Sequence, residues 1–338
     1  MRPWRGRRMH NLITDIPGIA VGHATDLTLG SGCTAVLFDR AAVMAVTIRG
    51  GAPGGRDTAM LEPEMTRQEI DGVVLSGGSV FGLDAAGGVQ AWLREQGRGF
   101  RLRGALVPLV SAAIVFDLLN GGDKGWGRFS PYRELGYAAA QAAVHDAFPL
   151  GTVGAGTGAT TSTLKGGLGS ASATTANGHL VGAIVTVNAV GSATIADGPH
   201  FWAAPWEVGH EFGGLGMPAH PDTTLRMKGA PVPPSTTIAL VATDAKLTKA
   251  QAKRLAIMAD DGLARAIHPA HAPMDGDTVF AAATGSGAAV DDLALSEMGH
   301  VAACTLARAI GRGVFHATAL PYPDALPAWH QRFGKLAG

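Results

Sequence analysis

The stretch that decides the fold is PVPPSTTIALVATDA, residues Pro231–Ala245. A proline-rich segment ends at Ser235, two threonines follow, and an apolar run then begins. Threonine is a good strand former, so the simplest interpretation is the entry to a buried strand. A second interpretation is self-cleavage of the Ser235–Thr236 bond. The freed α-amine of Thr236, with an ordinary pKa of about 7.7–8.0, would then act as general base for its own hydroxyl.

Composition narrows the class of protein. The chain has 338 residues and is 46% hydrophobic, which is enough for a substantial core in one or two domains. Basic and acidic residues balance at 27 each, so no global charge points to nucleic acid. Cys33 and Cys304, the two cysteines, suit a reducing compartment. No apolar run approaches the ~20 residues of a membrane span, and the basic N-terminus lacks the apolar stretch of a signal peptide. We expect a cytoplasmic protein without nucleic-acid or membrane partners.

Strand-like and helix-like segments alternate along the chain, which predicts a layered α/β fold with helices covering sheets. The 48 glycines have no fixed period and indicate layers whose backbones approach closely. The patterns predict the following elements: strands 33–39 and 42–48 paired around a short turn, a buried strand 71–79, a helix 80–96 capped by Ser79, a helix capped by Ser130, strand 238–242, a helix behind a Thr248/Gln251 capping box, the strand DTVFAAAT (277–284), and a long helix ending at Gly311. The segment Pro218–Pro234 is expected to be an internal loop rather than a domain linker.

Two motifs give only weak evidence for a ligand site. GAGTGA, Gly154–Ala159, matches a dinucleotide-binding pattern, but no acidic residue follows before Asp197 to hold a ribose, so a tight turn is favoured. HPAHAPMDGD offers His268, His271, Asp275 and Asp277 as a possible metal set. The two histidines flank a proline and need not converge, so we expect a solvated loop and no metal or other cofactor.

Three further features stand out beside Thr236. Lys165 is the lone charged residue between Phe148 and Ala196, either a surface lysine or a desolvated one with a lowered pKa. Asn188 ends an apolar strand, where its amide either caps the strand or donates to a developing oxyanion. Asp275 and Asp277 are two apart, so in an extended chain their carboxylates share one side and repel. From the spacing alone, a solvated turn is the favoured interpretation of that pair.

Five stretches, in the same order along the chain, resemble the DmpA-type aminopeptidases, a group of self-processing amidohydrolases that includes nylon-oligomer endohydrolases. They are ITDIPGIAVGHATD (13–26), RGGAPGGRD (49–57), LSGGSVFGLDAAGGVQAWL (75–93), GAGTGATTSTLKGG (154–167) and STTIALVATDA (235–245). The resemblance spans Ile13 to about Ile310 and implies an α-β-β-α sandwich of the N-terminal-nucleophile type.

The resemblance also implies roles for single residues. Thr236 corresponds to the nucleophile, and Ser235 precedes the scissile bond. The other implied positions are Lys165 as the catalytic-site lysine, Asn188 as the oxyanion residue, Asp275 and Asp277 beside the nucleophile, and Phe116, Ser79 and Gly78 at the substrate. A flexible tail (1–12) and a single catalytic domain (13–338) are expected, cut into chains 1–235 and 236–338 that stay together. Such two-chain units are expected to form tetramers.

Two positions differ from the pattern of the aminopeptidase members, and both bear on which substrate is cleaved. Aminopeptidase members carry an acidic residue and a tyrosine where this chain has Ile114 and Phe116 in AAIVFDL. Because Ile114 cannot bind an ammonium group, the sequence favours endo-cleavage, or an amide without a free amine. Three alternatives to a peptide or oligoamide hydrolase stay open: acyl transfer as in ornithine acetyltransferases, a small-molecule binding protein that never cleaves, and a metal-dependent hydrolase using His268 and His271.

Overall fold

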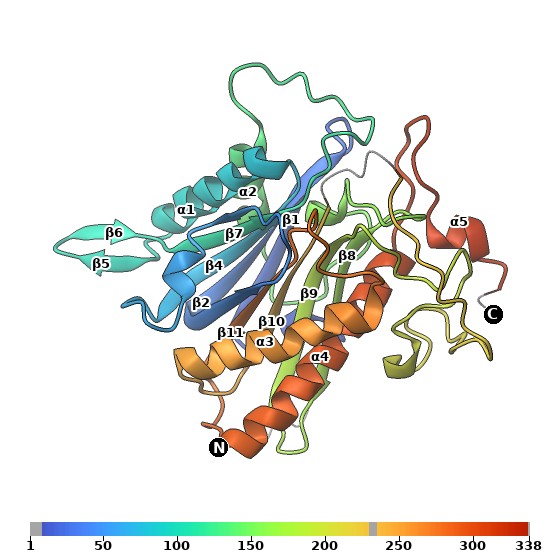
Figure 1. Cartoon of the computed structure of the whole chain (residues 1–338). Helices are drawn as coiled ribbons and strands as arrows, with labels where there is room; N and C mark the ends of the chain where they lie inside the picture. Colours follow the sequence, from blue (N-terminus) through green and yellow to red (C-terminus); the bar gives the residue numbers. More distant parts are fainter. Residues whose placement is uncertain (1–8, 230–234, 337–338) are drawn as a thin grey trace.

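A mixed β-sheet with a helical layer on each side organises the chain (Figure 1). The computed structural model describes residues 9–229 and 235–336. The sheet order is β3-β7-β4-β2-β11-β10-β9-β8, with β1 added beside β2. The strands are β1 (Ile19–Asp26), β2 (Ser31–Ile48), β3 (Gly55–Arg56), β4 (Glu69–Ser76), β7 (Val110–Ile114), β8 (Gly167–Thr174), β9 (Leu180–Asn188), β10 (Thr236–Thr243) and β11 (Thr278–Ala283), and a separate hairpin of β5 (Phe100–Leu102) and β6 (Ala105–Val107) projects from the body.

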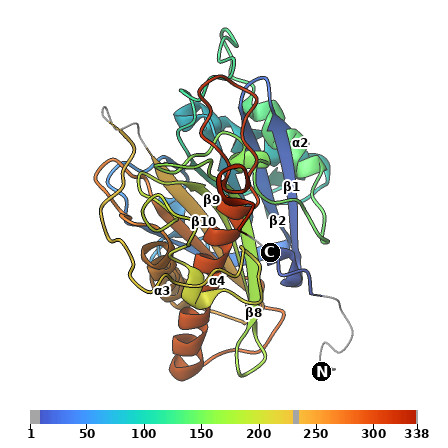
Figure 2. The same ribbon diagram turned by 90° about the vertical axis from the view of Figure 1, so that its right-hand side faces the viewer.

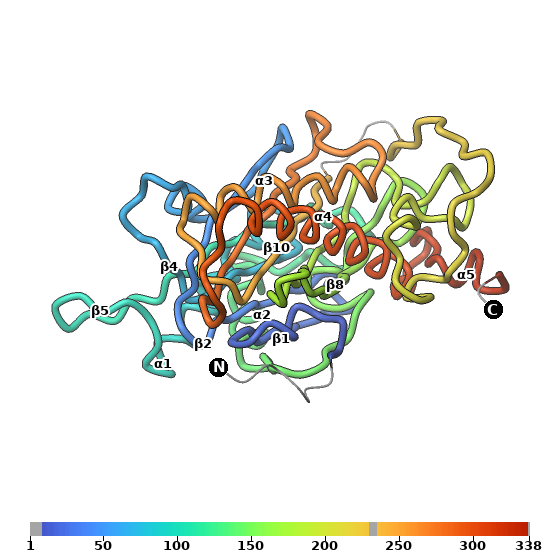
Figure 3. Tube along the Cα trace, turned by 90° about the horizontal axis from the view of Figure 1, so that it is seen from below, coloured from blue at the N-terminus to red at the C-terminus, as the bar shows by residue number. Residues whose placement is uncertain are grey.

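The helices lie in two layers on opposite sides of the strands (Figures 2 and 3). One layer holds α1 (Ala85–Glu95) and α2 (Tyr132–Gln141), and the other holds α3 (Lys249–Ala266) and α4 (Asp292–Phe315). The short α5 (Trp329–Phe333) follows near the C-terminus. Three apolar cores separate the layers: one under α1 and α2, one under α3 and α4, and one between the two halves of the sheet. The expected α-β-β-α sandwich is therefore confirmed.

Strand β10 shows how side chains that alternate between the two faces of the sheet contribute to two of these cores. Ile238 and Leu240 point into the core between the sheet halves, whereas Ala239 and Val241 point toward α3 and α4. All eight residues of β10 are buried. The strand runs antiparallel to β9 and parallel to β11, so the segment that begins at Thr236 lies deep in the sheet.

Glycines allow the layers to approach. A Cβ on Gly88 of α1 would lie 1.9 Å from the carbonyl oxygen of Arg133, and one on Gly136 of α2 would lie 2.0 Å from that of Ala85. A Cβ on Gly169 of β8 would lie 1.8 Å from the carbonyl oxygen of Ala309 in α4. These contacts agree with the close backbone packing expected from the glycine content.

Several expected element boundaries are wrong. The strands expected at 33–39 and 42–48 are one strand, β2, with an irregularity between Leu37 and Ala42. Its first half pairs with β1 and its second half with β11, so the two runs do not pair with each other. The helix expected from residue 80 starts as a 3-10 turn, Ser79–Asp84, and becomes α-helical at Ala85.

The remaining helix predictions fare differently. The Thr248/Gln251 capping box is confirmed at the start of α3. Pro131 rather than Ser130 precedes α2, and α4 runs past Gly311 to Phe315. Of the expected tail, residues 1–8 lie outside the described residues, whereas Asn11 bonds to Glu211 and Arg308. Of the expected loop 218–234, residues 218–229 are irregular and 230–234 lie outside the described residues.

Candidate active site

The Ser235–Thr236 join lies buried at the entrance to β10. Both residues are at most 3% exposed. The hydroxyl of Thr236 donates to the carbonyl oxygen of Ser235, and the backbone N–H of Gly276 donates to the same oxygen at 2.9 Å. A Cβ at position 276 would lie 2.7 Å from Thr236 Oγ1, so glycine is needed there for the loop to reach the hydroxyl. The carbonyl that precedes Thr236 thus has an N–H donor and a hydroxyl beside it.

Asp275 and Asp277 flank this join but have different surroundings. Asp277 accepts from the backbone N–H of Thr237 at 2.8 Å and from His271 Nδ1 at 3.0 Å. Asp275 Oδ1 is 3.4 Å from the backbone N of Val190. Burial, together with the negative charge of Asp277, raises the pKa of Asp275 to about 7. Asp277 therefore has strong hydrogen-bond donors on both oxygens, whereas Asp275 has a long contact and a raised pKa.

Asn188 is the cross-strand partner of Thr236. Its Oδ1 accepts from the backbone N–H of Thr160 at 2.9 Å and from Lys228 Nζ at 3.3 Å, and its Nδ2 donates to the carbonyl of Phe116 at 3.1 Å. Two pure donors on one side and an acceptor on the other fix the orientation of the amide. The amide nitrogen is therefore directed at Phe116 rather than at the carbonyl of Ser235.

Lys165 is desolvated, as one of the two interpretations expected. It is 1% exposed, and its amine donates to the carbonyls of Gly156, Ala159 and Gly166 at 2.7–2.9 Å. Burial lowers the pKa of Lys165 to about 7, and the charge of Asp117 opposes that shift. Through its three carbonyl acceptors, Lys165 ties the loop before β8 together.

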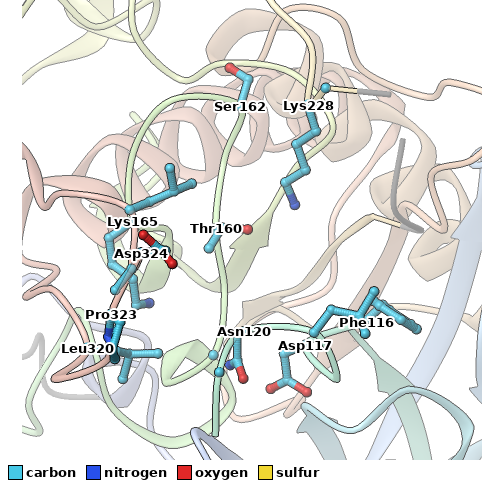
Figure 4. A pocket seen from close by; sticks show the side chains of 16 residues that line it. Phe116, Asp117, Asn120, Thr160, Ser162, Lys165, Lys228, Leu320, Pro323 and Asp324 are labelled. Atoms are coloured by element: carbon cyan, nitrogen blue, oxygen red, sulfur yellow. The ribbon is translucent and has the colours of Figure 1, made fainter. Parts of the chain in front are cut away.

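A cavity of about 530 Å³ lies beside this cluster (Figure 4). Lys228 reaches into it from the side opposite Asp117 and Asn120. Thr160 and Lys165 also line it, whereas Thr236 is not among its lining residues in the described part of the chain. Lys228 Nζ lies 3.2 Å from Ser235 Oγ, so the lysine links the cavity wall to the Ser235–Thr236 join.

The three expected substrate-binding residues fall in different places. Phe116 lines the cavity. Gly78 and Ser79 are not among its lining residues, although the backbone N–H of Gly78 donates to Asp117 at 2.7 Å. Ile114 is buried in β7, and the carboxylates on the cavity wall are instead Asp117 and Asp324.

The histidines do not act as a pair. His268 stacks on Trp202 with ring centroids 4.1 Å apart and bonds to the carbonyl of Ala264. His271 bridges two acids instead, since its Nδ1 contacts Asp277 at 3.0 Å and its Nε2 contacts Asp260 at 3.3 Å. Their hydrogen bonds raise the pKa of His271 to about 10. Within residues 9–229 and 235–336, no group of three or more His, Cys, Asp or Glu side chains is placed to hold a metal ion.

Comparison with known proteins decides the family. The family model for peptidase family S58 matches residues 11–325. This chain belongs to peptidase family S58. It is 41% identical over 331 residues to an uncharacterized aminopeptidase of Mycobacterium tuberculosis, covering 91% of this chain and 94% of that one. It is 29% identical over 299 residues to the 6-aminohexanoate-oligomer endohydrolase of Agromyces, covering 84% and 78%. The resemblance to DmpA-type enzymes is thereby confirmed, and membership makes the chain a peptidase or amidohydrolase.

A solved structure agrees on the fold. The L-aminopeptidase D-Ala-esterase/amidase of Ochrobactrum anthropi, described as a variant of the Ntn-hydrolase fold, superposes with a TM-score of 0.72 at 20% identity. The alignment covers 99% of this family S58 chain and 98% of that structure. No helix in the described residues is long and apolar enough to cross a membrane.

The cavity residues missed by sequence reasoning include Asp117, Asn120, Lys228 and Asp324. Asp117 is adjacent to Phe116 and had a signal, since an acidic residue directly after an apolar strand is a candidate for a site. Lys228 had none, because a lysine in a proline-rich loop is usually a solvated side chain. Its contacts with Ser235 and Asn188 depend on how that loop crosses the end of β9.

Proposed function

We propose that this family S58 chain is a self-activating amidohydrolase whose nucleophile is Thr236. The observation that carries the proposal is the arrangement at the join, where the Ser235 carbonyl oxygen accepts hydrogen bonds from both the Thr236 hydroxyl and the Gly276 N–H. A donor on that oxygen stabilises the negative charge that develops when the carbonyl carbon is attacked.

Self-cleavage proceeds in two steps. Thr236 Oγ1 attacks the Ser235 carbonyl carbon, and the carbon–nitrogen bond breaks as the nitrogen takes up a proton, which leaves an ester between the two residues. Water then attacks the ester, giving a carboxylate on Ser235 and a free α-amine and hydroxyl on Thr236. The elevated pKa of Asp275, about 7, suits a group that passes protons at this join near neutral pH.

The mature enzyme repeats the chemistry on its substrate. The α-amine of Thr236 takes the hydroxyl proton as Oγ1 attacks an amide carbonyl, and the proton then passes to the leaving amine. Water hydrolyses the resulting acyl-enzyme. The substrate class we propose is short peptides or oligoamides, in line with the aminopeptidase and oligomer endohydrolase relatives. We also propose that the two-chain units assemble into tetramers.

Matched substitutions at position 236 test this function. Thr236→Ala removes the hydroxyl and is expected to give neither self-cleavage nor hydrolysis of a 6-aminohexanoate oligomer. Thr236→Ser keeps a hydroxyl and is expected to retain both. Hydrolysis by an uncut Thr236→Ala protein would overturn the assignment. Amine acceptors should leave the turnover rate unchanged, since a rise would instead support acyl transfer.

A matched pair of substrates tests whether the enzyme requires a free amine on its substrate. Asp117 and Asp324 line the cavity, so a free ammonium group has carboxylates within the same space. An oligoamide and its N-acetylated form are compared by kcat/KM. Equal values support the endo-cleavage favoured by Ile114, whereas strong preference for the free amine supports an aminopeptidase.

A further inference from the structure

Lys228 makes its side-chain contacts at the scissile join. Its amine donates to Ser235 Oγ at 3.2 Å and to Asn188 Oδ1 at 3.3 Å. The first partner belongs to the residue before the cut, and the second belongs to the cross-strand neighbour of Thr236. Lys228 therefore connects the end of β9 with the residue just before β10, where the Thr236 hydroxyl lies against the Ser235 carbonyl.

The backbone of Lys228 is fixed as well. Its N–H donates to the carbonyl of Val190 at 2.9 Å, just beyond the end of β9. The charges that act on the side chain are the opposite charge of Asp275 and the like charge of Lys165. A lysine whose backbone N–H is bonded and whose amine has two acceptors is an ordered group rather than a solvated loop lysine.

Cleavage would change one of the two contacts of the Lys228 amine, the one with Ser235. Lys228 and Ser235 lie on the same side of the cut, so breaking the Ser235–Thr236 bond frees Ser235 from β10. The contact with Ser235 no longer bears on Thr236 after that step.

We propose that Lys228 is a positioning residue for self-cleavage, which aligns Ser235 and Asn188 around the scissile bond in the uncut chain. The inference rests on the proposed self-cleavage and assigns a residue that acts in maturation. It acts through Ser235 and Asn188 rather than on the reacting atoms.

The test follows self-cleavage of the full chain from the moment of cell-free synthesis, using denaturing gels. Lys228→Ala is expected to slow cleavage on the order of 10- to 100-fold, because misplacing the reacting groups lowers the rate that strongly. Arg226→Met is the matched control: it removes a cation two residues away that pairs with Asp197 at 3.3 Å, and it is expected to cut at the wild-type rate. Lys228→Arg, which keeps donors and charge, is expected to cut faster than Lys228→Ala.

Chemical rescue separates positioning from a general structural role. Lys228→Ala removes three carbons and the amine from a residue that lines an open cavity. Propylamine is therefore expected to restore the cleavage rate saturably, while 1-propanol is not, and the wild type with propylamine serves as reference. Mass spectrometry should show a carboxylate on Ser235; a propylamide there would mean that the amine acted as nucleophile and would overturn the proposal.

The experiment distinguishes a failure of the proposed function from a failure of the inference about Lys228. Wild-type chain that is never cut removes the proposed function itself. Wild-type chain that is cut, together with Lys228→Ala cut at the same rate, removes the inference about Lys228 alone. Equal slowing by Lys228→Ala and Arg226→Met would likewise contradict it.

Discussion

At the scale of single residues, the site works by giving chemically similar groups different surroundings. Asp277 has the Thr237 N–H and His271 as donors, whereas burial and the charge of Asp277 raise the pKa of Asp275 to about 7. Two carboxylates that are two residues apart thus differ in their hydrogen bonds, and the pKa of Asp275 is raised. Spacing alone placed both on one side of the chain. The surroundings of Asp277 depend on His271, which also contacts Asp260, and no sequence pattern connects these residues.

A prediction at this scale concerns Lys165. Lys249 is an internal control, because its amine is also bonded to three carbonyls, those of Met60, Met65 and Arg67, away from the site. Lys165→Met and Lys249→Met each leave carbonyls without a donor, so each is expected to lower the free energy of unfolding, on the order of 1–3 kcal/mol. Self-cleavage is expected to fall about 100-fold in Lys165→Met alone. Equal cleavage rates in the two variants would show that Lys165 is structural.

A second prediction concerns His271 and pH. Its pKa rises from 6.5 to about 10 in the folded protein, so its charged form stabilises the fold fully below pH 6.5 and this stabilisation is lost as the pH rises through about 10. Urea unfolding of His271→Gln is compared with its parent, both carrying Thr236→Ala so that neither is cut. The difference in unfolding free energy should be largest near pH 6 and shrink by pH 10. A difference that is constant over this range would contradict the bridge to Asp260 and Asp277.

At the scale of elements, the sequence predicts well those strands that are buried along their whole length. It fails where one strand pairs with different neighbours along its length. The apolar runs that became β9, β10 and β11 were found from composition, since each is buried along its length. Strand β2 was divided because Asp39 and Arg40 look like a turn. They are instead the exposed middle of one strand, at the point where its pairing passes from β1 to β11.

Neighbouring glycines in α1 give a prediction for this scale. A Cβ on Gly88 would lie 1.9 Å from the Arg133 carbonyl oxygen and push α1 from α2, whereas one on Gly87 would meet only the Arg133 side chain at 3.4 Å or more. Gly88→Ala is expected to destabilise the protein by about 1–3 kcal/mol. Gly87→Ala is expected to stabilise it by up to about 1 kcal/mol through helix propensity. Chemical unfolding of both variants checks this; equal effects would contradict the close helix contact.

At the scale of the whole molecule, the site lies where the expected two chains share one sheet. Strand β10 follows the proposed cut, yet eight of its residues pair with β9, which precedes it. Helix α4 also packs on β8 and β9. A cut chain is therefore expected to stay together through one buried core.

That expectation has a direct measurement. Cut protein should migrate as a single species in native gel filtration and separate into two chains in denaturant. Sedimentation of the same sample gives the number of two-chain units, for which we expect four. Spontaneous loss of the smaller chain under native conditions would contradict the shared core.

The central claim, that the Ser235–Thr236 bond is scissile, is tested most directly by the mass of the purified protein under denaturing conditions. The account predicts two chains, the smaller of which spans 236–338 and begins at Thr236 on N-terminal sequencing. An intact chain after prolonged incubation, or a cut at another bond, would contradict it.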